Sequence, residues 1–349
     1  MYKIPLNKST LEKDDLDAAA EVLYSDRLTQ GPLVERFEAE FAEYVGAKYA
    51  VMVNSGSSAN LLAVVACKQY LGWSPGMRIS VPALTWSTTV HPLLQALCIP
   101  EWRDCSLESF QTKGCQMAVH LLGNATSPRI ALIEDCCESL GVYIDGRHVG
   151  TFGLAGTFSF YFSHHITTIE GGMVVTDDKA LADLMRSIRS HGWARSYDPA
   201  EIKLKFPDTD PAFLMLNTGF NLRSTEINAA LGLSQLRKLA HFNHRRREIF
   251  EYWGGSDMAI AKNVTAAPFC YPLFRYDPDV RANIDAASVE TRPLICGNLT
   301  KHPAFSAWSG VELPNATLVH KYGFYLGLSP MLNDEEVEYV KEVLKRECK

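Results

Sequence analysis

The sequence has no excess of basic residues. Its 349 residues include 34 Lys and Arg against 40 Asp and Glu, which gives a net charge of −6. General nucleic-acid binding needs a basic surface, so this class is excluded. Long apolar runs are also missing, because the longest stretches without a formal charge, 79–100 and 148–169, contain His, Ser and Thr. Neither is apolar enough to span a bilayer, and we expect no membrane association.

Cysteine is sparse and has no recognisable pattern. The nine cysteines form no C-x-x-C pair, their number is odd, and no secretion signal opens the sequence. We therefore expect reduced thiols that mostly fill the core, and a cytoplasmic protein. No H-E-x-x-H motif occurs either, and we expect no metal site.

The composition does provide enough apolar material for a large core. Hydrophobic residues make up 47% and charged residues 21%, both near the average of globular proteins. Helical periodicity alternates with short apolar runs, which predicts an α/β fold with a parallel or mixed sheet covered on both faces. The pattern shortens late in the chain, so we predict a large domain over 1–240 and a smaller α+β domain over 241–349.

The expected elements follow from these periods. Helices are predicted at 11–23, 33–44, 59–69, 88–96, 224–253 and 334–347, and strands at 49–53, 79–81, 130–133, 157–162 and 173–176.

A tight turn of small residues is the first candidate site. Asn54-Ser55-Gly56-Ser57-Ser58-Ala59-Asn60 joins the strand at 49–53 to a helix N-terminus. Free backbone N–H groups there bind an anion such as phosphate, and the Ser hydroxyls add donors. A simple helix cap has the same sequence pattern, so both interpretations stay open.

The second candidate is a pair of carboxylates at the end of an apolar strand, in Ile133-Glu134-Asp135-Cys136-Cys137-Glu138-Ser139. Ligands of α/β proteins bind at the carboxyl ends of the strands. Asp135 could hold a proton on the nitrogen of a heterocyclic cofactor such as pyridoxal phosphate (PLP), ligate Mg²⁺, or cap the next helix.

An aromatic strand that enters a polar turn is the third candidate. Segment 156–176 contains His164 and His165, then Gly171-Gly172 and another strand. Adjacent residues of an extended chain face opposite ways, so the two histidines are not expected to ligate one metal. A single His in such a turn is usually structural. His164 is nevertheless the residue that we consider as a candidate for catalysis.

The order and spacing of these three segments resemble the DegT/DnrJ/EryC1/StrS sugar aminotransferases, which have the PLP-dependent aspartate aminotransferase fold. The resemblance extends from about Pro5 to the C-terminus. Further segments carry it: Gly31-Pro32, Val34-Glu35-Arg36-Phe37, Val81-Pro82-Ala83 with Trp86, and Gly219-Phe220-Asn221-Leu222-Arg223. It implies a mixed, mostly parallel sheet flanked by helices, with a smaller C-terminal α+β domain, and PLP chemistry on nucleotide-linked sugars.

One position departs from the family pattern. The family binds PLP covalently on a Lys in the third segment, and His164 occupies that position, with no Lys between Lys113 and Lys179. Ser163-His164-His165 resembles the family's branch of GDP-4-keto-6-deoxy-D-mannose 3-dehydratases, as do Ser190-His191-Gly192-Trp193 and Arg292-Pro293. Glu138 stands where most of the aminotransferases have Gln.

The resemblance to this branch implies a lyase-type reaction of deoxysugar and O-antigen polysaccharide biosynthesis. The cofactor stays noncovalent, as PLP or pyridoxamine phosphate (PMP), whose amine condenses with the C4 ketone of a nucleotide-linked 4-keto-6-deoxyhexose. His164 removes a proton and the C3 hydroxyl leaves. Hydrolysis gives a 3,6-dideoxy-4-keto sugar, and L-glutamate regenerates PMP. GDP-4-keto-6-deoxymannose is the leading substrate candidate.

The resemblance also assigns the site residues. The expected cofactor contacts are Gly56, Ser57 and Ser159 at the phosphate, Trp86 on the ring, Asp135 at the pyridine nitrogen, and Glu138. Asn221 is expected to reach the phosphate of the partner subunit, in a homodimer with shared active sites. The substrate candidates are His191, Arg195 and Arg292, and His165 is expected to be structural.

Other interpretations remain. A nucleotide-sugar aminotransferase would need another Lys, and an inactive PLP- or sugar-binding regulator has no reason to keep Asp135, Ser159 and Trp86. A second dehydratase branch with His uses a [2Fe–2S] cluster held by neighbouring cysteines. After Cys137 the only cysteines are Cys270, Cys296 and Cys348, single and far apart, so we expect no iron–sulfur cluster.

Overall fold

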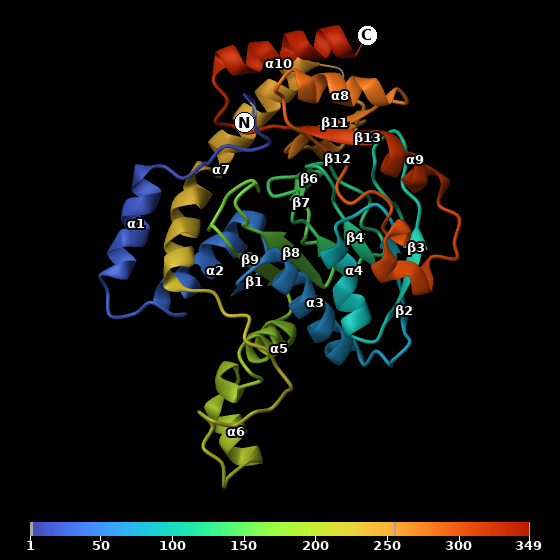
Figure 1. Ribbon diagram of the computed structural model, residues 1–349. Coiled ribbons are helices and arrows are strands. Elements are labelled where there is room, and N and C mark those ends of the chain that lie inside the picture. Colours follow the sequence, from blue (N-terminus) through green and yellow to red (C-terminus); the bar gives the residue numbers. More distant parts are fainter. Residues whose placement is uncertain (1–2, 255, 349) are drawn as a thin grey trace.

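The computed structural model describes residues 3–254 and 256–348, and it has the α/β architecture that the sequence predicts (Figure 1). A five-stranded sheet in the order β1-β9-β8-β5-β4 lies at its centre. The strands are β1 (Tyr49–Val53), β4 (Met117–Val119), β5 (Ile133–Asp135), β8 (Ala155–Ser159) and β9 (Gly172–Thr176). β4, β5 and β8 pair in parallel, whereas β9 is antiparallel to both β1 and β8. The sheet is therefore mixed, with β9 as its reversed strand.

Two further strands form a separate two-stranded sheet beside β4. β2 (Arg78–Pro82) and β3 (Ile99–Arg103) are parallel to each other, and β2 lies beside β4. The N–H and Oγ of Ser80 donate to Gln116 Oε1 at 3.1 and 3.3 Å, and Gln116 N–H donates to Ser80 Oγ at 2.9 Å. Side-chain hydrogen bonds thus replace backbone pairing at the start of β4.

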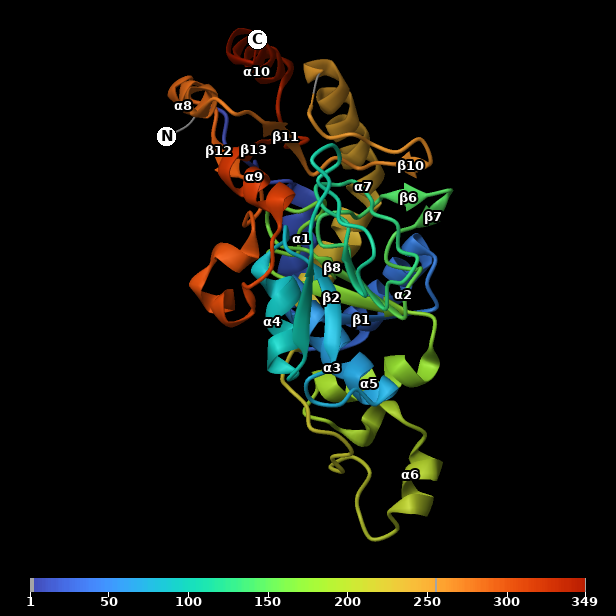
Figure 2. The same ribbon diagram turned by 90° about the vertical axis from the view of Figure 1, so that its right-hand side faces the viewer.

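Helices cover both faces of the sheet (Figures 1 and 2). α2 (Pro32–Val45) and the first half of α7 (Glu226–Trp253) pack on one face, and α1 (Lys13–Leu23) lies on α7. α3 (Gly56–Leu71), α4 (Ser87–Gln95) and α5 (Lys179–Arg189) pack on the other face. Strand residues alternate between the two cores: Met173 and Val175 face α2, and Val174 faces α3. The strands are buried on both sides, which explains their continuous apolar runs.

A smaller antiparallel sheet closes one end of the molecule. β11 (Cys270–Phe274), β13 (Gly323–Gly327) and β12 (Thr291–Pro293) pair in the order β11-β13-β12. Three helices accompany this sheet: α8 (Pro278–Ala286), α9 (Pro314–Tyr322) and α10 (Asp334–Glu347). The start of the chain joins this unit, because Ile4 pairs with Val289 and is buried in the same core.

The predicted domain boundary near residue 240 falls inside α7, which runs unbroken from Glu226 to Trp253. Leu233 and Leu239 pack in the core of the large sheet, while Ile249 and Trp253 pack with the small sheet. The helix belongs to both cores. Its hydrophobic periodicity does not change along its length, so the sequence does not show where one core ends and the other begins.

Two predicted strands have different ends. The strand predicted at 130–133 begins only at Ile133, because Ala131 N–H donates to Pro128 O at 2.9 Å and closes a turn. The strand predicted at 157–162 stops at Ser159. Beyond it the chain turns, and His164 N–H donates to Tyr161 O at 2.9 Å. Aromatic residues in this segment therefore suggested a longer strand than exists.

The short elements lie at the periphery. β6 (Tyr143–Ile144), β7 (Arg147–His148) and β10 (Val264–Thr265) form a small sheet. The segment around α6 (Pro199–Lys205) projects from the end of the molecule opposite α10 (Figures 1 and 2). Its Leu204 and Phe213 side chains are 84% and 70% exposed. Among the described residues, no helix combines the length and apolar character needed to traverse a bilayer.

Candidate active site

The carboxyl ends of the central strands surround a cavity of about 410 Å³. β1 leads into the turn at Ser55, β5 ends at Asp135 and β8 ends at Ser159, and all three residues line the cavity. The small sheet contributes Tyr325 to the opposite wall. Eight residues predicted from the sequence line this one cavity: Gly56, Ser57, Trp86, Asp135, Glu138, Ser159, His164 and Arg292.

The N-terminus of α3 points its free N–H groups at the cavity. Ser55 is the N-cap, and its Oγ accepts a hydrogen bond from Ser58 N–H at 3.1 Å. The N–H groups of Gly56 and Ser57 come before the first intrahelical hydrogen bond, so they are available to an anion. A Cβ on Gly56 would lie 2.5 Å from Ser159 Cβ. Glycine thus lets the helix start approach Ser159, and together they form a cradle of the right chemistry for a phosphate.

Asp135 is fixed by hydrogen bonds to both of its carboxylate oxygens. Asn60 Nδ2 and Thr89 Oγ1 donate to Oδ2, each at 2.8 Å, and Cys137 N–H donates to Oδ1 at 3.2 Å. Thr157 Oγ1 donates to Asn60 Oδ1 at 2.6 Å and so sets the orientation of that amide. A carboxylate fixed in this way is suited to hold a protonated ring nitrogen.

Trp86 provides a flat apolar surface at the rim. It is the N-cap residue of α4, lines the cavity, and is 54% exposed. Its neighbour Thr85 shares a 2.8 Å hydrogen bond with Thr89, which ties the rim to the partners of Asp135. An exposed indole face at this place suits stacking against a planar ring.

Glu138 is a half-buried carboxyl group on the cavity wall. Leu122 N–H donates to its Oε2 at 2.9 Å. Burial, together with the nearby charge of Asp135, raises the pKa of Glu138 to about 7, although the Leu122 hydrogen bond opposes this. Glu138 can therefore gain or lose a proton near neutral pH.

His164 lies in the turn after β8 and lines the cavity. Its ring packs against Phe269 and Tyr161, with centroids 5.4 and 5.9 Å away. Nδ1 is buried and has no hydrogen-bond partner among the described residues. Burial, and then the charge of Arg246, lowers the pKa of His164 to about 4. The imidazole is therefore neutral at neutral pH and able to accept a proton.

His165 faces away from this cavity. It is fully buried, its Nε2 hydrogen-bonds Ala267 O at 2.9 Å, and burial holds its pKa well below the usual range. These contacts agree with the structural role expected for it.

Three predicted residues lie outside the cavity of this chain. His191 packs against Trp193, and the Arg195 guanidinium lies 3.7 Å from the centre of the Trp193 ring. Asn221 is exposed, and Arg223 Nε donates to its Oδ1 at 2.9 Å. None of these three residues lines the cavity of its own chain. Arg292 does line the cavity, near Glu290, whose Oε1 lies 3.5 Å from Nη2 of Arg292.

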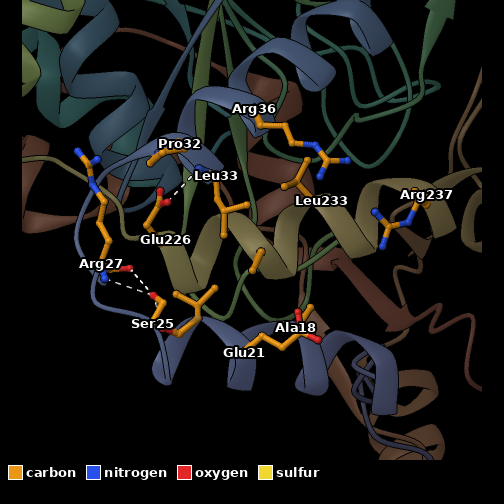
Figure 3. Close-up of a pocket in the computed structure, with 12 residues that line it drawn as sticks. Ala18, Glu21, Ser25, Arg27, Pro32, Leu33, Arg36, Glu226, Leu233 and Arg237 are labelled. Carbon is orange, nitrogen blue, oxygen red and sulfur yellow. Dashed lines mark hydrogen bonds between the residues drawn. The ribbon is translucent and has the colours of Figure 1, made fainter.

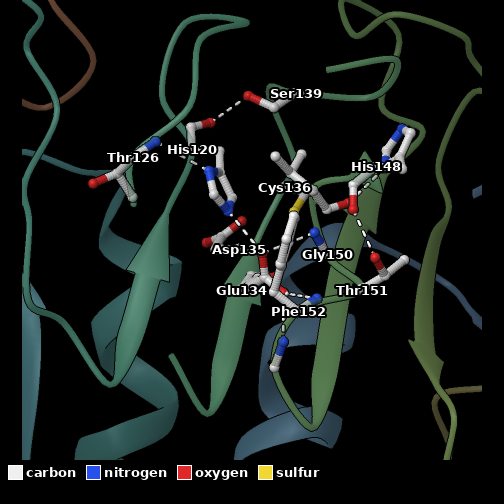
Figure 4. A network of polar contacts seen from close by, with 12 residues as sticks. His120, Thr126, Glu134, Asp135, Cys136, Ser139, His148, Gly150, Thr151 and Phe152 are labelled. Carbon is white, nitrogen blue, oxygen red and sulfur yellow. Dashed lines mark hydrogen bonds and ion pairs between the residues drawn. The ribbon is translucent and has the colours of Figure 1, made fainter. Parts of the chain in front are cut away.

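A buried polar network lies beside the cavity and is centred on Glu134 (Figure 4). His120 Nε2 lies 3.0 Å from Glu134 Oε2, and Thr126 N–H donates to His120 Nδ1 at 3.2 Å, which places the ring proton on Nε2. Further donors to Glu134, at 2.9, 2.7 and 2.7 Å, are the N–H groups of Gly150, Phe152 and Gly153. Burial raises the pKa of Glu134, but these hydrogen bonds outweigh it and lower the pKa overall. Cys136 lies close enough for a metal site, yet the ring nitrogens and carboxylate oxygens are already used, so the network is structural.

A second hollow, of about 470 Å³, lies between α1, α2 and α7 (Figure 3). Leu33 and Leu233 line it, and its arginines are Arg27, Arg36 and Arg237. Glu226 there is occupied as a cap for α2, because it accepts the N–H groups of Leu33 and Val34, each at 2.9 Å. None of the residues predicted for catalysis or cofactor binding lines this hollow, so its size does not make it the reaction site.

Three residues shape the site although no role was predicted for them. Asn60 and Thr89 orient Asp135, and Phe269 packs on His164. Asn60 lies one helical turn after Gly56, so the spacing predicts that it is on the same side of α3, but it does not predict its pairing with Asp135. Phe269 lies in a segment without a distinctive sequence pattern, so its contact with His164 could not be predicted from the sequence.

The chain is similar in sequence and in fold to known proteins of one family. The sequence profile of the DegT/DnrJ/EryC1/StrS aminotransferase family matches residues 9–114 and 113–345. GDP-4-keto-6-deoxy-D-mannose 3-dehydratase of Yersinia pseudotuberculosis is 33% identical, over 99% of this chain and 99% of that protein. The E. coli GDP-4-keto-6-deoxy-D-mannose-3-dehydratase with bound hydrated PLP is similar in structure, with a TM-score of 0.89 and 30% identity over 99% of this chain and 100% of that one. A GDP-4-keto-6-deoxymannose-3-dehydratase with a trapped PLP–glutamate geminal diamine gives a TM-score of 0.89 at 29% identity, over 98% and 100% of the two chains.

Proposed function

The chain belongs to the DegT/DnrJ/EryC1/StrS aminotransferase family, and from this premise we propose that it is a PLP-dependent 3-dehydratase of a nucleotide-linked 4-keto-6-deoxyhexose. The reaction removes the C3 hydroxyl of the sugar. GDP-4-keto-6-deoxymannose is the substrate that we assign first, because a relative named for it is 33% identical over 99% of the chain. L-glutamate is the proposed amino donor, since a solved relative holds a PLP–glutamate adduct.

One observation carries this proposal: the residue that lines the cavity at the family's lysine position is His164. No Lys is among the described residues that line the cavity. The cavity therefore offers no lysine amine to which PLP could be attached covalently. It offers instead the neutral imidazole of His164, which can accept a proton.

The residues around the cavity fit this cofactor. The phosphate would lie at Gly56, Ser57 and Ser159, where the absence of a Cβ on Gly56 leaves room for the close approach. Asp135 would hold the ring nitrogen, and Trp86 would cover one face of the ring. PLP, when bound, supplies a conjugated ring that takes up electrons from the reacting carbon.

The side chains then divide the remaining work. His164 accepts a proton at Nε2, because Nδ1 is buried while the ring lines the cavity. Glu138, with a pKa of about 7, can hold a proton beside the cofactor site. Arg292 and Tyr325 come from the small sheet and cover the cavity on that side, which restricts the access of water.

We further propose a homodimer in the cytoplasm, with active sites shared between subunits. Asn221 and Arg195 are exposed and lie outside the cavity of their own chain. Leu204 and Phe213, on the projecting segment around α6, are largely exposed. Exposed apolar side chains of this size favour an interface, and a second copy would cover them.

The family name favours a second candidate, a nucleotide-sugar aminotransferase. That reaction normally uses a Lys to release the aminated product, and His164 opposes it. The inactive regulator is opposed by the intact set of hydrogen bonds around Asp135, which a pure binding protein does not need.

Mass spectrometry of the product separates these candidates. The protein is incubated with PLP, glutamate and a panel of GDP-, dTDP-, CDP- and UDP-linked 4-keto-6-deoxyhexoses. A 3-dehydratase yields a sugar that has lost one oxygen atom and releases ammonia. An aminotransferase yields a sugar in which an amine replaces the ketone oxygen, and this product would contradict the proposal. A regulator changes neither sugar nor glutamate.

A further inference from the structure

The proposed base, His164, lacks the partner that usually orients a catalytic histidine. Such histidines commonly hydrogen-bond a carboxylate or a carbonyl through the second ring nitrogen. Here Nδ1 is buried and unpartnered within the described protein. Among the described residues, the aromatic rings that pack on the imidazole are Phe269 and Tyr161, and its position depends on the backbone of the turn that carries it.

Arg246, on α7, holds that backbone. Its Nη2 donates to His164 O at 3.2 Å and its Nη1 donates to His165 O at 3.3 Å. The planar guanidinium therefore grips two consecutive carbonyl groups, which a single ammonium group cannot do with the same rigidity. These hydrogen bonds join residues that are 81 and 82 positions apart.

Arg246 is also unusual for a buried cation. Its side chain is only 2% exposed, and no carboxylate lies within ion-pair distance of it among the described residues. Its neighbour Arg245 pairs with Glu248 and Asp334 at the surface. A buried charge without a counter-ion lowers the free energy of unfolding. An uncharged residue would therefore serve a purely structural role with less loss of stability.

We propose that Arg246 is a positioning residue for the dehydration, which fixes His164 in the cavity by gripping the carbonyls of His164 and His165. This inference rests on the proposed function, in which His164 moves the proton. A shift of about 1 Å in a reacting group commonly costs 100-fold in rate, so loss of this grip is expected to lower kcat.

The charge of Arg246 also allows a second measurement, the pKa of His164. It adds to burial in lowering the pKa of His164. Among the described residues, the other titratable or charged groups next to the ring or across the cavity are Tyr161, His165, Asp135, Cys137, Glu138, Glu170, Arg292 and Tyr325. The Arg246 variants keep the identity of each of these groups, and Arg246→Lys also keeps the cation. A change in the titration of His164 that is confined to Arg246→Ala therefore reports on the charge at position 246.

Three variants test the proposal. Arg246→Ala removes both the grip and the charge, Arg246→Lys keeps the charge, and Arg245→Ala removes the same charge one residue away. We expect kcat to fall by about 100-fold in both Arg246 variants, with the KM for the sugar unchanged and Arg245→Ala active. Arg246 lines a cavity of about 280 Å³, so added guanidinium should restore part of the kcat of Arg246→Ala. In cofactor-free protein, NMR titration should show a higher His164 pKa only in Arg246→Ala.

The outcomes separate the two proposals. If wild type dehydrates no sugar in the panel, the proposed function fails, while the NMR titration still tests the contact of Arg246 with His164. Full activity of Arg246→Lys, or no effect of guanidinium on Arg246→Ala, contradicts the positioning role. If neither Arg246 variant folds, Arg246 serves the fold and the inference is wrong.

Discussion

Gly56 and Ser159 approach each other so closely that a Cβ on Gly56 would lie 2.5 Å from Ser159 Cβ and 2.8 Å from its Oγ. Ser159 is the last residue of the buried strand β8, so its backbone cannot move aside. The contact joins the helix start that follows β1 to the end of β8. It therefore defines the width of the proposed phosphate cradle.

Gly56→Ala should weaken cofactor binding and lower the free energy of unfolding. The added methyl group overpacks the contact with Ser159, which commonly costs about 1–3 kcal/mol. The measurements are the dissociation constant for PLP and urea unfolding of the cofactor-free protein. Gly310→Ala is the matched control, because no atom lies within 4 Å of a Cβ there. Unchanged PLP affinity in Gly56→Ala would remove Gly56 from the site.

Asp135→Asn should abolish dehydration and leave the fold intact. The amide has nearly the same shape and can still hydrogen-bond Thr89 Oγ1, but it cannot hold a proton on a ring nitrogen through a negative charge. Circular dichroism and thermal unfolding check the fold, and product mass spectrometry checks the reaction. Thr85→Ser, which leaves the carboxylate untouched, serves as the control. Wild-type turnover in Asp135→Asn would be incompatible with the assignment.

The sequence predicted the residues that stand beside strand ends, and it could not predict their partners. Gly56, Asp135 and His164 follow or end strands, where side chains meet at one edge of the sheet. The partners Asn60 and Thr89 lie 75 and 46 positions from Asp135. Such pairs depend on packing between elements, which a local pattern does not contain.

The same limit applies to the fold. α10 is found at the predicted residues 334–347, since a long amphipathic period is a strong signal. β12, with three residues, has no period to recognise, and its sheet forms only because β13 lies between β11 and β12. Ile4, near the start of the chain, pairs with Val289 in the small C-terminal unit. Neither segment has a sequence pattern that predicts this pairing.

Stability of the cofactor-free protein should depend on the protonation of Glu138. The folded-state pKa of about 7 lies above the ordinary value of 4.5, so the folded protein holds a proton that the unfolded chain releases. This contribution to stability is complete below pH 4.5 and is lost as the pH rises to about 7. The lowered pKa of His164 has the opposite sign and is common to wild type and variant.

Glu138→Gln should therefore remove this pH dependence. The measurement is the difference in free energy of unfolding between wild type and Glu138→Gln, followed by urea unfolding from pH 4.5 to about 7. We expect wild type to lose stability relative to the variant across this range. Glu101→Gln, whose side chain is 36% exposed, is the control. A constant difference over the range would mean that Glu138 ionises normally.

His164→Lys should bind PLP covalently and stop dehydration. A Lys at this position supplies the amine that the cavity lacks among its described residues. It also removes the imidazole, and the loss of a general base commonly costs about 10²–10⁴ in rate. Borohydride reduction followed by peptide mass spectrometry should find phosphopyridoxyl on Lys at position 164 in the variant and on no Lys in wild type. Phosphopyridoxyl on a wild-type Lys that is needed for activity would restore the aminotransferase interpretation.

Asn221 provides the test of shared active sites. Its Oδ1 accepts a hydrogen bond from Arg223 Nε, which leaves the amide N–H₂ group available as a donor. Asn221 is exposed and does not line the cavity of its own chain. If it completes the phosphate site of a second subunit, Asn221→Ala and Asp135→Asn should each be inactive as purified homodimers.

Mixed dimers of these two variants should recover activity. In a twofold dimer, the subunit with Asn221→Ala keeps Asp135 and receives an intact Asn221 from its partner, so one of the two sites is complete. Random exchange makes half of the dimers mixed, and activity should return to about a quarter of wild type. The two variants are unfolded together and refolded, and the dimers are separated from monomers and aggregates by size. Dehydration by this mixture of dimers is then measured. Refolding each variant alone is the control. If Asn221 acts within its own chain, both sites of the mixed dimer stay defective, and no activity returns.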